Sequence, residues 1–377
     1  MLYAIAFILS AIICGLIIYL NNHNILRLTR EEDLAAVQAS HSRATPRLGG
    51  VGIISALFVS LLLSSDPTAA HYLVILAASG LLGVVSLLED VGKPMSPRVR
   101  LIAAAISALV GILLSGYVIA RTDEIVTTAL LEAIWPVSAL LTVFIVSGLS
   151  NAFNLIDGMN GLCSSATIIS AGALGIIAQN AGLNGHADVL LLLCMAVFGF
   201  MIFNFPRGHL FLGDMGAYLI GFITAWAGIS IIVEAPGVSP WAILLCVFWP
   251  VADTALAIYR RRHKKMAADQ PDRLHFHQLL MRAIEINWLS RKMRYVANPL
   301  TTILITPLMA APALSGTVLY DKPIFAFLAF ILFGVLFFST YQIGIRRASK
   351  RRLPRVLGPA LKSHPLHRDR KLEIQDA

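Results

Sequence analysis

The chain alternates long apolar runs with short polar segments over most of its length. A helix that spans a membrane needs about 20 mostly apolar residues. Eleven runs come near that length, at about 2–20, 48–65, 71–88, 101–120, 134–149, 164–180, 187–204, 214–233, 240–259, 300–320 and 323–345. The pattern predicts an all-α integral membrane protein, a polytopic bundle of about 11 transmembrane helices within a single domain over residues 1–345.

The two ends of the chain differ in character. The first run, LYAIAFILSAIICGLIIYL, lacks the basic flank and the small-residue cleavage site of a signal peptide, so we expect a retained helix. Residues 346–377 are rich in Arg, Lys and Pro and too polar to pack a core. We expect them to form a mobile, basic cytoplasmic tail.

Lysine and arginine concentrate in alternate loops. Loops that would share one side of the membrane hold 28 of the 30 basic residues, and the other side holds only Arg121 and Lys322. The positive-inside rule then places the N-terminus outside and the C-terminus in the cytoplasm. The net charge of +9 is explained by this anchoring and by attraction to anionic membrane lipids, so no nucleic-acid partner is expected. Four scattered cysteines without CxxC spacing predict neither disulfides nor a zinc site.

Acidic residues gather in the loops predicted to face the cytoplasm. They include Asp90, Asp157 and Asp214, which come from three separate loops. Carboxylates that converge in this way favour a divalent cation, and oxygen ligands favour Mg²⁺, with Mn²⁺ as an alternative. Arg47, Arg43, Lys93, Arg98 and Arg100 would be poor neighbours of a metal unless an anion such as a diphosphate lay among them.

Asp253 stands inside an apolar run, seven residues before Arg260. In a straight helix it would lie about 10 Å into the bilayer from that end. It can snorkel or pair with another helix, but an acidic residue in a span more often faces a functional cavity. The segment PDRLHFHQ places His275 and His277 two residues apart, a spacing that suits a metal site or, given the charge around it, hydrogen bonds to phosphate or sugar.

Glycines stand beside these polar residues at three predicted helix starts. The segments are TPRLGG (45–50), DGMNG (157–161) and LGDMG (212–216). Glycine permits a tight turn or close approach of a ligand, and a helix N-terminus with free N–H groups is an anion site.

These segments resemble the signatures of a known family. NAFNLIDGMNGL resembles NAxNxxDGxDGL, FLGDMGAYLIGF resembles FxGDxGSxxxGF, and PDRLHFHQLL resembles DxxHxHHxL. LEDVGK and TPRLGG are similar to the DDxxK and TPxxGG segments. The family is the polyprenyl-phosphate N-acetylhexosamine-1-phosphate transferases, that of MraY and WecA, and the motifs run in its order from about residue 40 to 345.

The resemblance implies a multi-pass enzyme of the bacterial inner (cytoplasmic) membrane. It would use Mg²⁺ at the cytoplasmic face to transfer a sugar 1-phosphate from a UDP-N-acetyl sugar to undecaprenyl phosphate, releasing UMP. By matching positions, Asp214 and Asp157 would hold the metal, and the catalytic residues would be Glu89, Asp90, Asp157, His275 and His277. Residues that would bind the substrates are Arg47, Lys93, Arg100, Asn151, Asn154, Asn160, Asn204, Phe211 and Arg273, with Phe211 stacked on the uracil. A homodimer is compatible with the resemblance.

Three positions depart from the signatures. Glu89 replaces the first Asp of DDxxK, Asn160 the second Asp of DGxDG, and Gln278 the third His of HxHH. Glu89 keeps the charge on a longer side chain, which suits a supporting role. Asn160 offers both a hydrogen-bond donor and an acceptor where Asp offers only acceptors, which weakens the prediction that the base is uracil. The histidine segment has the WecA-like form, which points to a lipid-linked glycan such as O-antigen, with the phospho-muramyl-pentapeptide transferase as the alternative.

The mechanism and two other classes stay open at this point. Asp90 could act as a general base, orient the lipid phosphate or help to hold the metal, and a phospho-aspartyl route through Asp157 or Asp90 is a weaker rival. A secondary transporter would suit the many spans, but its sites cluster near the bilayer midplane in paired halves, and no repeat is evident. The DGxxAR spacing of CDP-alcohol phosphotransferases is absent.

Overall fold

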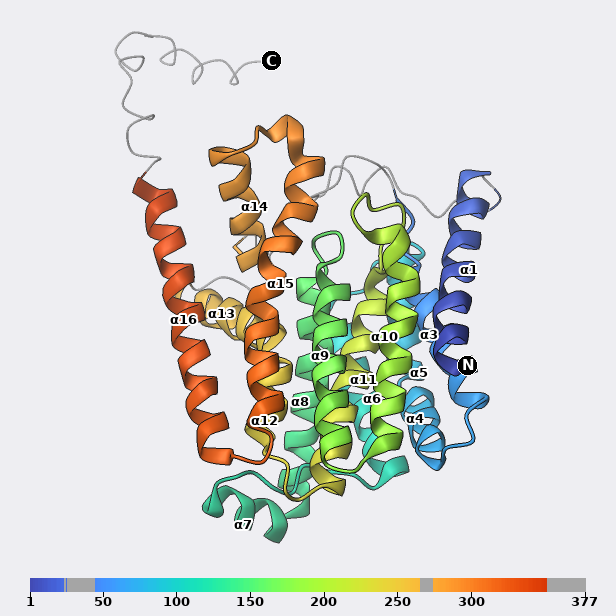
Figure 1. Cartoon of the computed structure of the whole chain (residues 1–377), viewed down its shortest axis with the longest axis vertical. Coiled ribbons are helices and arrows are strands. Elements are labelled where there is room, and N and C mark those ends of the chain that lie inside the picture. The colour runs from blue at the N-terminus through green and yellow to red at the C-terminus, as the bar shows by residue number, and fades with distance from the viewer. Residues whose placement is uncertain (24, 26–44, 265–273, 351–377) are drawn as a thin grey trace, which may run out of the picture.

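The structure is a computed structural model that describes residues 1–23, 25, 45–264 and 274–350. Within these residues all regular structure is helical (Figure 1). The helices are α1 (Leu2–Asn22), α3 (Gly49–Leu62), α4 (Pro67–Ala78), α5 (Gly80–Asp90), α6 (Pro97–Ser115), α7 (Ile125–Ala133), α8 (Trp135–Ile156), α9 (Leu162–Asn180), α10 (Asn184–Asn204), α11 (Gly213–Glu234), α12 (Pro240–Cys246), α13 (Phe248–Lys264), α14 (Phe276–Asn287), the 3₁₀ turn η1 (Arg291–Met293), α15 (Arg294–Val318) and α16 (Pro323–Lys350).

Each predicted apolar run is helical, but the described helices do not form eleven straight spans. Eight are long and apolar enough to cross a membrane, and two bent pairs raise the number to at most ten. The run at 48–65 forms α3, which is apolar but has only 14 residues. The short helix α7 was not predicted, because its run Ile125–Ala133 is too brief to read as a span. Arg273 and residues 351–377 of the predicted tail lie outside the described residues.

Local sequence explains the two bends. α4 and α5 meet at 54° around Ser79 and Gly80, a Gly/Ser pair of the kind that kinks helices, and Ser79 Oγ donates to the carbonyl of Leu76 at 2.7 Å. α12 and α13 meet at 84°. Pro250 has no N–H and its ring would collide with the carbonyl of Cys246, four residues earlier, where α12 ends.

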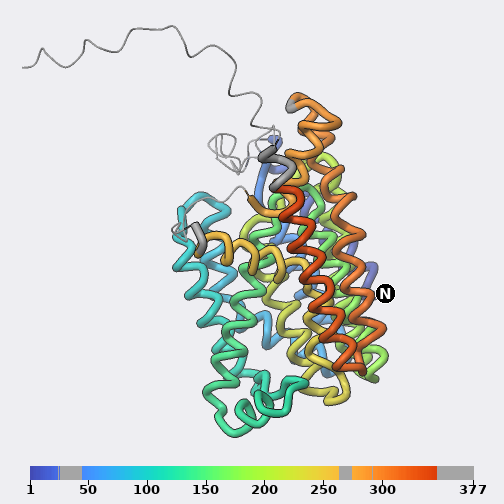
Figure 2. The backbone as a smooth tube through the Cα atoms, turned by 90° about the vertical axis from the view of Figure 1, so that its left-hand side faces the viewer, coloured from blue at the N-terminus to red at the C-terminus, as the bar shows by residue number. Residues whose placement is uncertain are grey.

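The bend at Val247 corrects the expectation for Asp253. This residue lies on α13, which runs across the bundle while most helices run along it (Figures 1 and 2). Distance along the chain from Arg260 therefore does not measure depth in a membrane, as it would in a straight span.

Helix α11 forms the centre of the bundle. It is apolar around its whole circumference, which is the pattern of a helix enclosed by others. Of the residues in its most apolar 18-residue stretch, 94% are buried. It packs against α3, α5, α8 and α9, while α1 covers α10 and α3 on one side and α15 and α16 cover α12 on the other.

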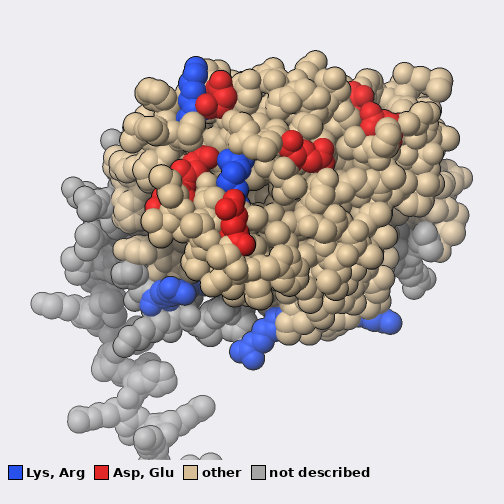
Figure 3. All heavy atoms as spheres, turned by 90° about the horizontal axis from the view of Figure 1, so that it is seen from below, with Lys and Arg blue, Asp and Glu red and all other residues tan. Residues whose placement is uncertain are grey.

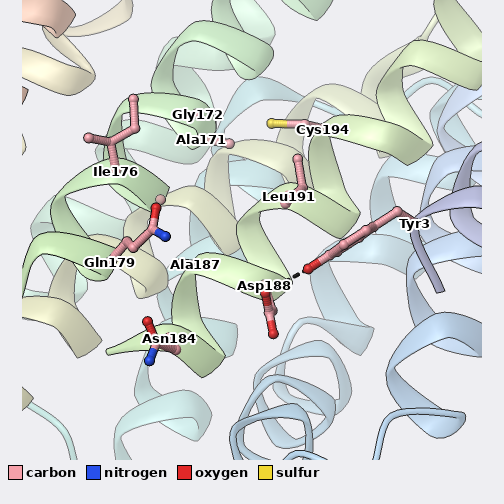
Figure 4. Close-up of a pocket in the computed structure, with 11 residues that line it drawn as sticks. Tyr3, Ala171, Gly172, Ile176, Gln179, Asn184, Ala187, Asp188, Leu191 and Cys194 are labelled. Atoms are coloured by element: carbon pink, nitrogen blue, oxygen red, sulfur yellow. Dashed lines mark hydrogen bonds between the residues drawn. The ribbon is translucent and has the colours of Figure 1, made fainter. Parts of the chain in front are cut away.

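The helices alternate in direction, so the loops between them meet at two ends. We call the end that holds the N-terminus of α11 and the C-terminus of α8 the site end; it is uppermost in Figure 1. Figure 3 looks onto the opposite end, where acidic and basic groups are scattered over a surface made mostly of other residues. Near the opposite end a cavity of about 410 Å³ lies between α1, α9 and α10, where Tyr3 donates to Asp188 Oδ1 at 2.6 Å (Figure 4). It includes no predicted site residue.

Candidate active site

Two glycine-containing segments, TPRLGG and FLGDMG, lie against each other at the site end. The N–H of Phe211 donates to the carbonyl of Pro46 at 2.9 Å, and the N–H groups of Gly49 and Gly50 donate to the carbonyls of Phe211 and Leu212 at 2.9 and 2.8 Å. A Cβ on Gly50 would lie 2.3 Å from Gly216 Cα, so only glycine allows α3 to approach α11 this closely.

Asp90 fixes the start of α11 from the end of α5. Its Oδ1 accepts from the N–H of Asp214 at 2.8 Å and its Oδ2 from the N–H of Met215 at 2.9 Å. These first-turn N–H groups have no partner within their own helix. From the sequence we expected such N–H groups to bind an anion of the substrate. In the structure they donate to the Asp90 carboxylate instead.

Asp214 is buried in the first turn of α11 and collects donors from three other segments. Its Oδ1 accepts from Arg47 Nη2 at 3.3 Å and from Asn154 Nδ2 at 3.1 Å, and its Oδ2 pairs with Arg100 Nη1. Arg100 also lies over the ring of Tyr218, with 5.9 Å to the centroid. The structure thus brings Arg47, Arg100 and Asn154, all predicted to bind the substrates, together around Asp214; their roles in binding stay predictions.

Asp157 follows α8 and belongs to the same cluster. Burial raises its pKa to about 7; the charge of Arg47 opposes this and that of Asp214 adds to it. Arg47 Nε also lies 3.9 Å from Asp90 Oδ1. One guanidinium therefore interacts with Asp90, Asp157 and Asp214, which confirms that these three carboxylates converge.

The histidine segment approaches the cluster from α14. His277 is 1% exposed, and its two ring nitrogens have no hydrogen-bond partner among the described residues. A Cβ on Gly158 would lie 2.7 Å from His277 Nε2, so this ring rests on the loop that carries Asp157. Burial lowers the pKa of His277 to about 4, which leaves the imidazole neutral at physiological pH. His275 instead pairs with Asp253, through its Nδ1 and Oδ2 at 2.8 Å.

Asn160 and Asn204, predicted to bind the nucleotide, hold loops together. Asn204 accepts from the N–H of Gly161 at 2.6 Å and donates to the carbonyl of Leu210 at 2.8 Å. Asn160 donates through Nδ2 to the carbonyl of Pro206 at 2.8 Å, while its Oδ1 is buried without a partner among the described residues. The nucleotide-binding role of both stays a prediction.

The remaining predicted residues surround the cluster at greater distance. Glu89 accepts from the N–H of Met95 and so closes the loop after α5, on which Lys93 is exposed. Asn151 Oδ1 accepts from the hydroxyl of Tyr218 at 3.3 Å. Phe211 is partly buried and is held by its backbone bonds to the TPRLGG segment. Arg273 lies outside the described residues.

Sequence reasoning missed several supporting residues. Tyr218 stands four residues after Asp214 and so shares its helix face, a spacing that could have indicated it. Asn298 and Thr302 of α15 bind the backbone of Asn160, through an N–H to Oδ1 bond of 2.8 Å and an Oγ1 to carbonyl bond of 2.7 Å. They are four residues apart at the start of an apolar run, a weaker signal.

The donor groups of the cluster suit Mg²⁺. Among the described residues no three His, Cys, Asp or Glu side chains form a ready metal-binding group. Magnesium, however, is usually bound by one or two carboxylates together with substrate phosphates and water. Asp214 and Asp157 supply such carboxylates. A carboxylate can accept about four hydrogen bonds or metal bonds, and Arg47, Arg100 and Asn154 use only three of these positions on Asp214.

Comparison with known proteins shows what the chain is similar to. The family model described as glycosyl transferase family 4 matches residues 72–232. An undecaprenyl-phosphate alpha-N-acetylglucosaminyl 1-phosphate transferase of Salmonella typhi is 28% identical over 325 residues, 82% of each chain. The protein of that name from Yersinia pestis is 28% identical over 255 residues, 64% of this chain and 67% of its own. A probable undecaprenyl-phosphate N-acetylglucosaminyl 1-phosphate transferase of Bacillus subtilis is 27% identical over 244 residues, again 64% of this chain and 67% of its own. Over residues 72–232 the chain is therefore similar to glycosyl transferase family 4, and over a longer stretch it is similar to these transferases.

Proposed function

We propose that this protein transfers N-acetylglucosamine 1-phosphate, or a related N-acetylhexosamine 1-phosphate, from a UDP-sugar to undecaprenyl phosphate. The reaction gives undecaprenyl-diphospho-sugar and UMP and starts a lipid-linked glycan such as O-antigen. The names of the relatives support this donor and acceptor, and the WecA-like histidine segment points away from a muramyl-pentapeptide substrate. The site would face the cytoplasm from the bacterial inner membrane, where nucleotide sugars are found.

The electrostatic interactions of Arg47 carry the proposal. Its guanidinium interacts with Asp90, Asp157 and Asp214, and Arg100 completes the set at Asp214. Arginine binds phosphate in a planar, two-point manner, and carboxylates together with phosphates bind Mg²⁺. A site that holds both positively and negatively charged side chains suits a substrate whose phosphates bind together with a metal ion.

The chemistry balances without a covalent protein intermediate. An oxygen of the lipid phosphate attacks the phosphorus that carries the sugar, the bond from that phosphorus to the bridging oxygen breaks, and UMP leaves with the electron pair. Positioning and neutralisation of charge supply most of the catalysis in such transfers. Mg²⁺ held by Asp214 and Asp157 would stabilise negative charge on the diphosphate. Arg47 and Arg100 would bind its oxygens, and neutral His277 would offer a hydrogen bond to phosphate or sugar.

Asp90 fits an orienting role better than that of a general base. Both its oxygens already accept backbone N–H groups of α11, so the carboxylate is engaged in holding the start of that helix. The lipid phosphate has a second pKa of about 6, so it is largely dianionic at neutral pH and needs little help to attack.

The test is a balance of products with purified, detergent-solubilised protein. We expect UMP and labelled lipid to form in equal amounts from UDP-N-acetylglucosamine, undecaprenyl phosphate and Mg²⁺, and a panel of UDP-sugars then ranks the donors. Labelled lipid without UMP, or no labelled lipid with any UDP-sugar, would contradict the proposal. A burst of UMP equal to the enzyme concentration in the absence of lipid would instead favour the phospho-aspartyl route.

A further inference from the structure

Asp253 is a buried acidic residue to which the proposed mechanism gives no task. It is 0% exposed and lies on α13. Its Oδ2 pairs with His275 Nδ1 at 2.8 Å, and its Oδ1 accepts from the N–H of Phe276 at 3.0 Å. Both oxygens thus bind the first turn of α14, where His275 is the N-cap and Phe276 the first helical residue.

The residue before this turn is fixed from a different helix. The hydroxyl of Tyr341, on α16, donates to the carbonyl of Leu274 at 3.1 Å and accepts from Arg260 Nη1 at 2.9 Å. The ring of Phe276 lies 5.3 Å from that of Phe337 on α16 and 5.0 Å from that of Trp249 on α13. Residues 274–276 are therefore bound in consecutive order by α13 and α16.

This attachment determines where His277 lies. His277 directly follows the bound residues 274–276. Its ring stacks on that of His275 with centroids 5.7 Å apart, and its Nε2 rests against Gly158. Its ring nitrogens are buried and have no partner among the described residues. A buried polar group without a partner costs about 1–3 kcal/mol, and native proteins rarely leave one unless a ligand, ion or water completes it.

We propose that Asp253 is a positioning residue that holds the first turn of α14 so that the His277 imidazole faces the Asp157 loop, ready to hydrogen-bond the substrate. The inference rests on the proposed function, since it needs a substrate at that loop. It also explains a buried charge in an apolar helix, because the carboxylate meets an imidazole and a backbone N–H in place of water.

The experiment measures kcat and KM for UDP-N-acetylglucosamine, by UMP release, with full-length Asp253→Ala. Carboxylates that orient metal-ligating histidines change activity by about 10- to 100-fold when they are removed, and we expect a loss of that order in kcat/KM. Asp253→Glu, which can still pair with His275, is expected to recover part of it. Where the alanine variant does not fold, Asp253→Asn replaces it and is expected to shift kcat/KM in the same direction by less.

A double mutant separates positioning from general stability. If Asp253 acts through His277, adding Asp253→Ala to His277→Ala should cause no further loss, because coupled residues are not additive. The matched control is Glu234→Ala, which removes the carboxylate that binds His186 Nε2 at 2.9 Å near the opposite end. We expect it to leave kcat/KM unchanged while lowering the thermal midpoint.

The outcomes distinguish the two proposals. Wild-type kcat/KM in Asp253→Ala, or full additivity of the Asp253 and His277 losses, overturns the positioning role even where the transferase activity is present. A wild-type enzyme that releases no UMP with any UDP-sugar overturns the proposed function, and the positioning role with it.

Discussion

Gly213 illustrates how a single residue places the site. Its φ is +81°, in the left-handed region, and a Cβ there would lie 2.0 Å from the carbonyl oxygen of Arg47 and 2.7 Å from Asp90 Oδ2. The chain thus turns from the FLGD segment into α11 only because no side chain stands between Arg47 and Asp90. The LGDMG pattern pointed to a tight turn, but the neighbours of the glycine depend on contacts between distant segments.

We predict that Gly213→Ala abolishes most UMP release, since the new methyl group must displace the Arg47 backbone or the Asp90 carboxylate. The matched control is Gly116→Ala. Gly116 also has a left-handed φ, +74°, but no atom lies within 4 Å of its Cβ position. Both variants bear a backbone cost of about 1–2 kcal/mol, so equal activity of the two would show that the contacts of Gly213 are unimportant.

At the scale of elements, the sequence predicted which segments are helical better than it predicted their lengths and directions. All eleven apolar runs are helical, yet two are bent pairs and one is short. A hydrophobic run indicates that a segment is buried in lipid or protein. The direction of the helix axis depends instead on local residues such as Pro250 and the Ser79–Gly80 pair, so hydropathy does not predict a bend of 84°. The pairing of Asp253 with His275 was missed for the same reason, because it requires α13 to cross the bundle.

The contact of α3 with α11 gives a prediction for stability. Gly50→Ala places a methyl group 2.3 Å from Gly216 Cα, and overpacking of this kind costs about 1–3 kcal/mol. We expect a lower thermal midpoint, measured by size-exclusion chromatography of heated, detergent-solubilised protein. The control is Gly148→Ala inside α8, where no atom lies within 4 Å; it should stabilise the helix by about 0.5–1 kcal/mol. A Gly50→Ala protein as stable as this control would exclude the close contact.

At the scale of the whole molecule, charge in the loops predicts orientation. The apolar runs divide the sequence so that 28 of the 30 Lys and Arg residues fall in alternate segments, and only Arg121 and Lys322 fall in the others. From the positive-inside rule we propose that the site end faces the cytoplasm. The sequence also predicted that the three carboxylates converge, because alternating helices bring alternate loops to one end. The sequence could not predict which residues contact each other within the cluster, for example that Asp90 accepts hydrogen bonds from the backbone of α11.

Orientation can be measured with a membrane-impermeant maleimide on intact cells. All four native cysteines are buried, so background labelling should be low. We expect Asp321→Cys, in the exposed turn between α15 and α16, to be labelled in intact cells. His209→Cys, exposed at the site end, should react only after permeabilisation. The reverse pattern would place the site outside the cell.

The central claim is that Asp214 and Asp157 hold a metal needed for sugar-phosphate transfer. Its most direct test is the Mg²⁺ dependence of UMP release by Asp214→Asn. Asp188→Asn, which changes a carboxylate bound to Tyr3 near the opposite end, is the control. We predict that wild type and Asp188→Asn respond alike to Mg²⁺ and lose activity in EDTA, while Asp214→Asn stays inactive at every Mg²⁺ concentration tested. Full activity of Asp214→Asn, with an unchanged response to Mg²⁺, would contradict the account.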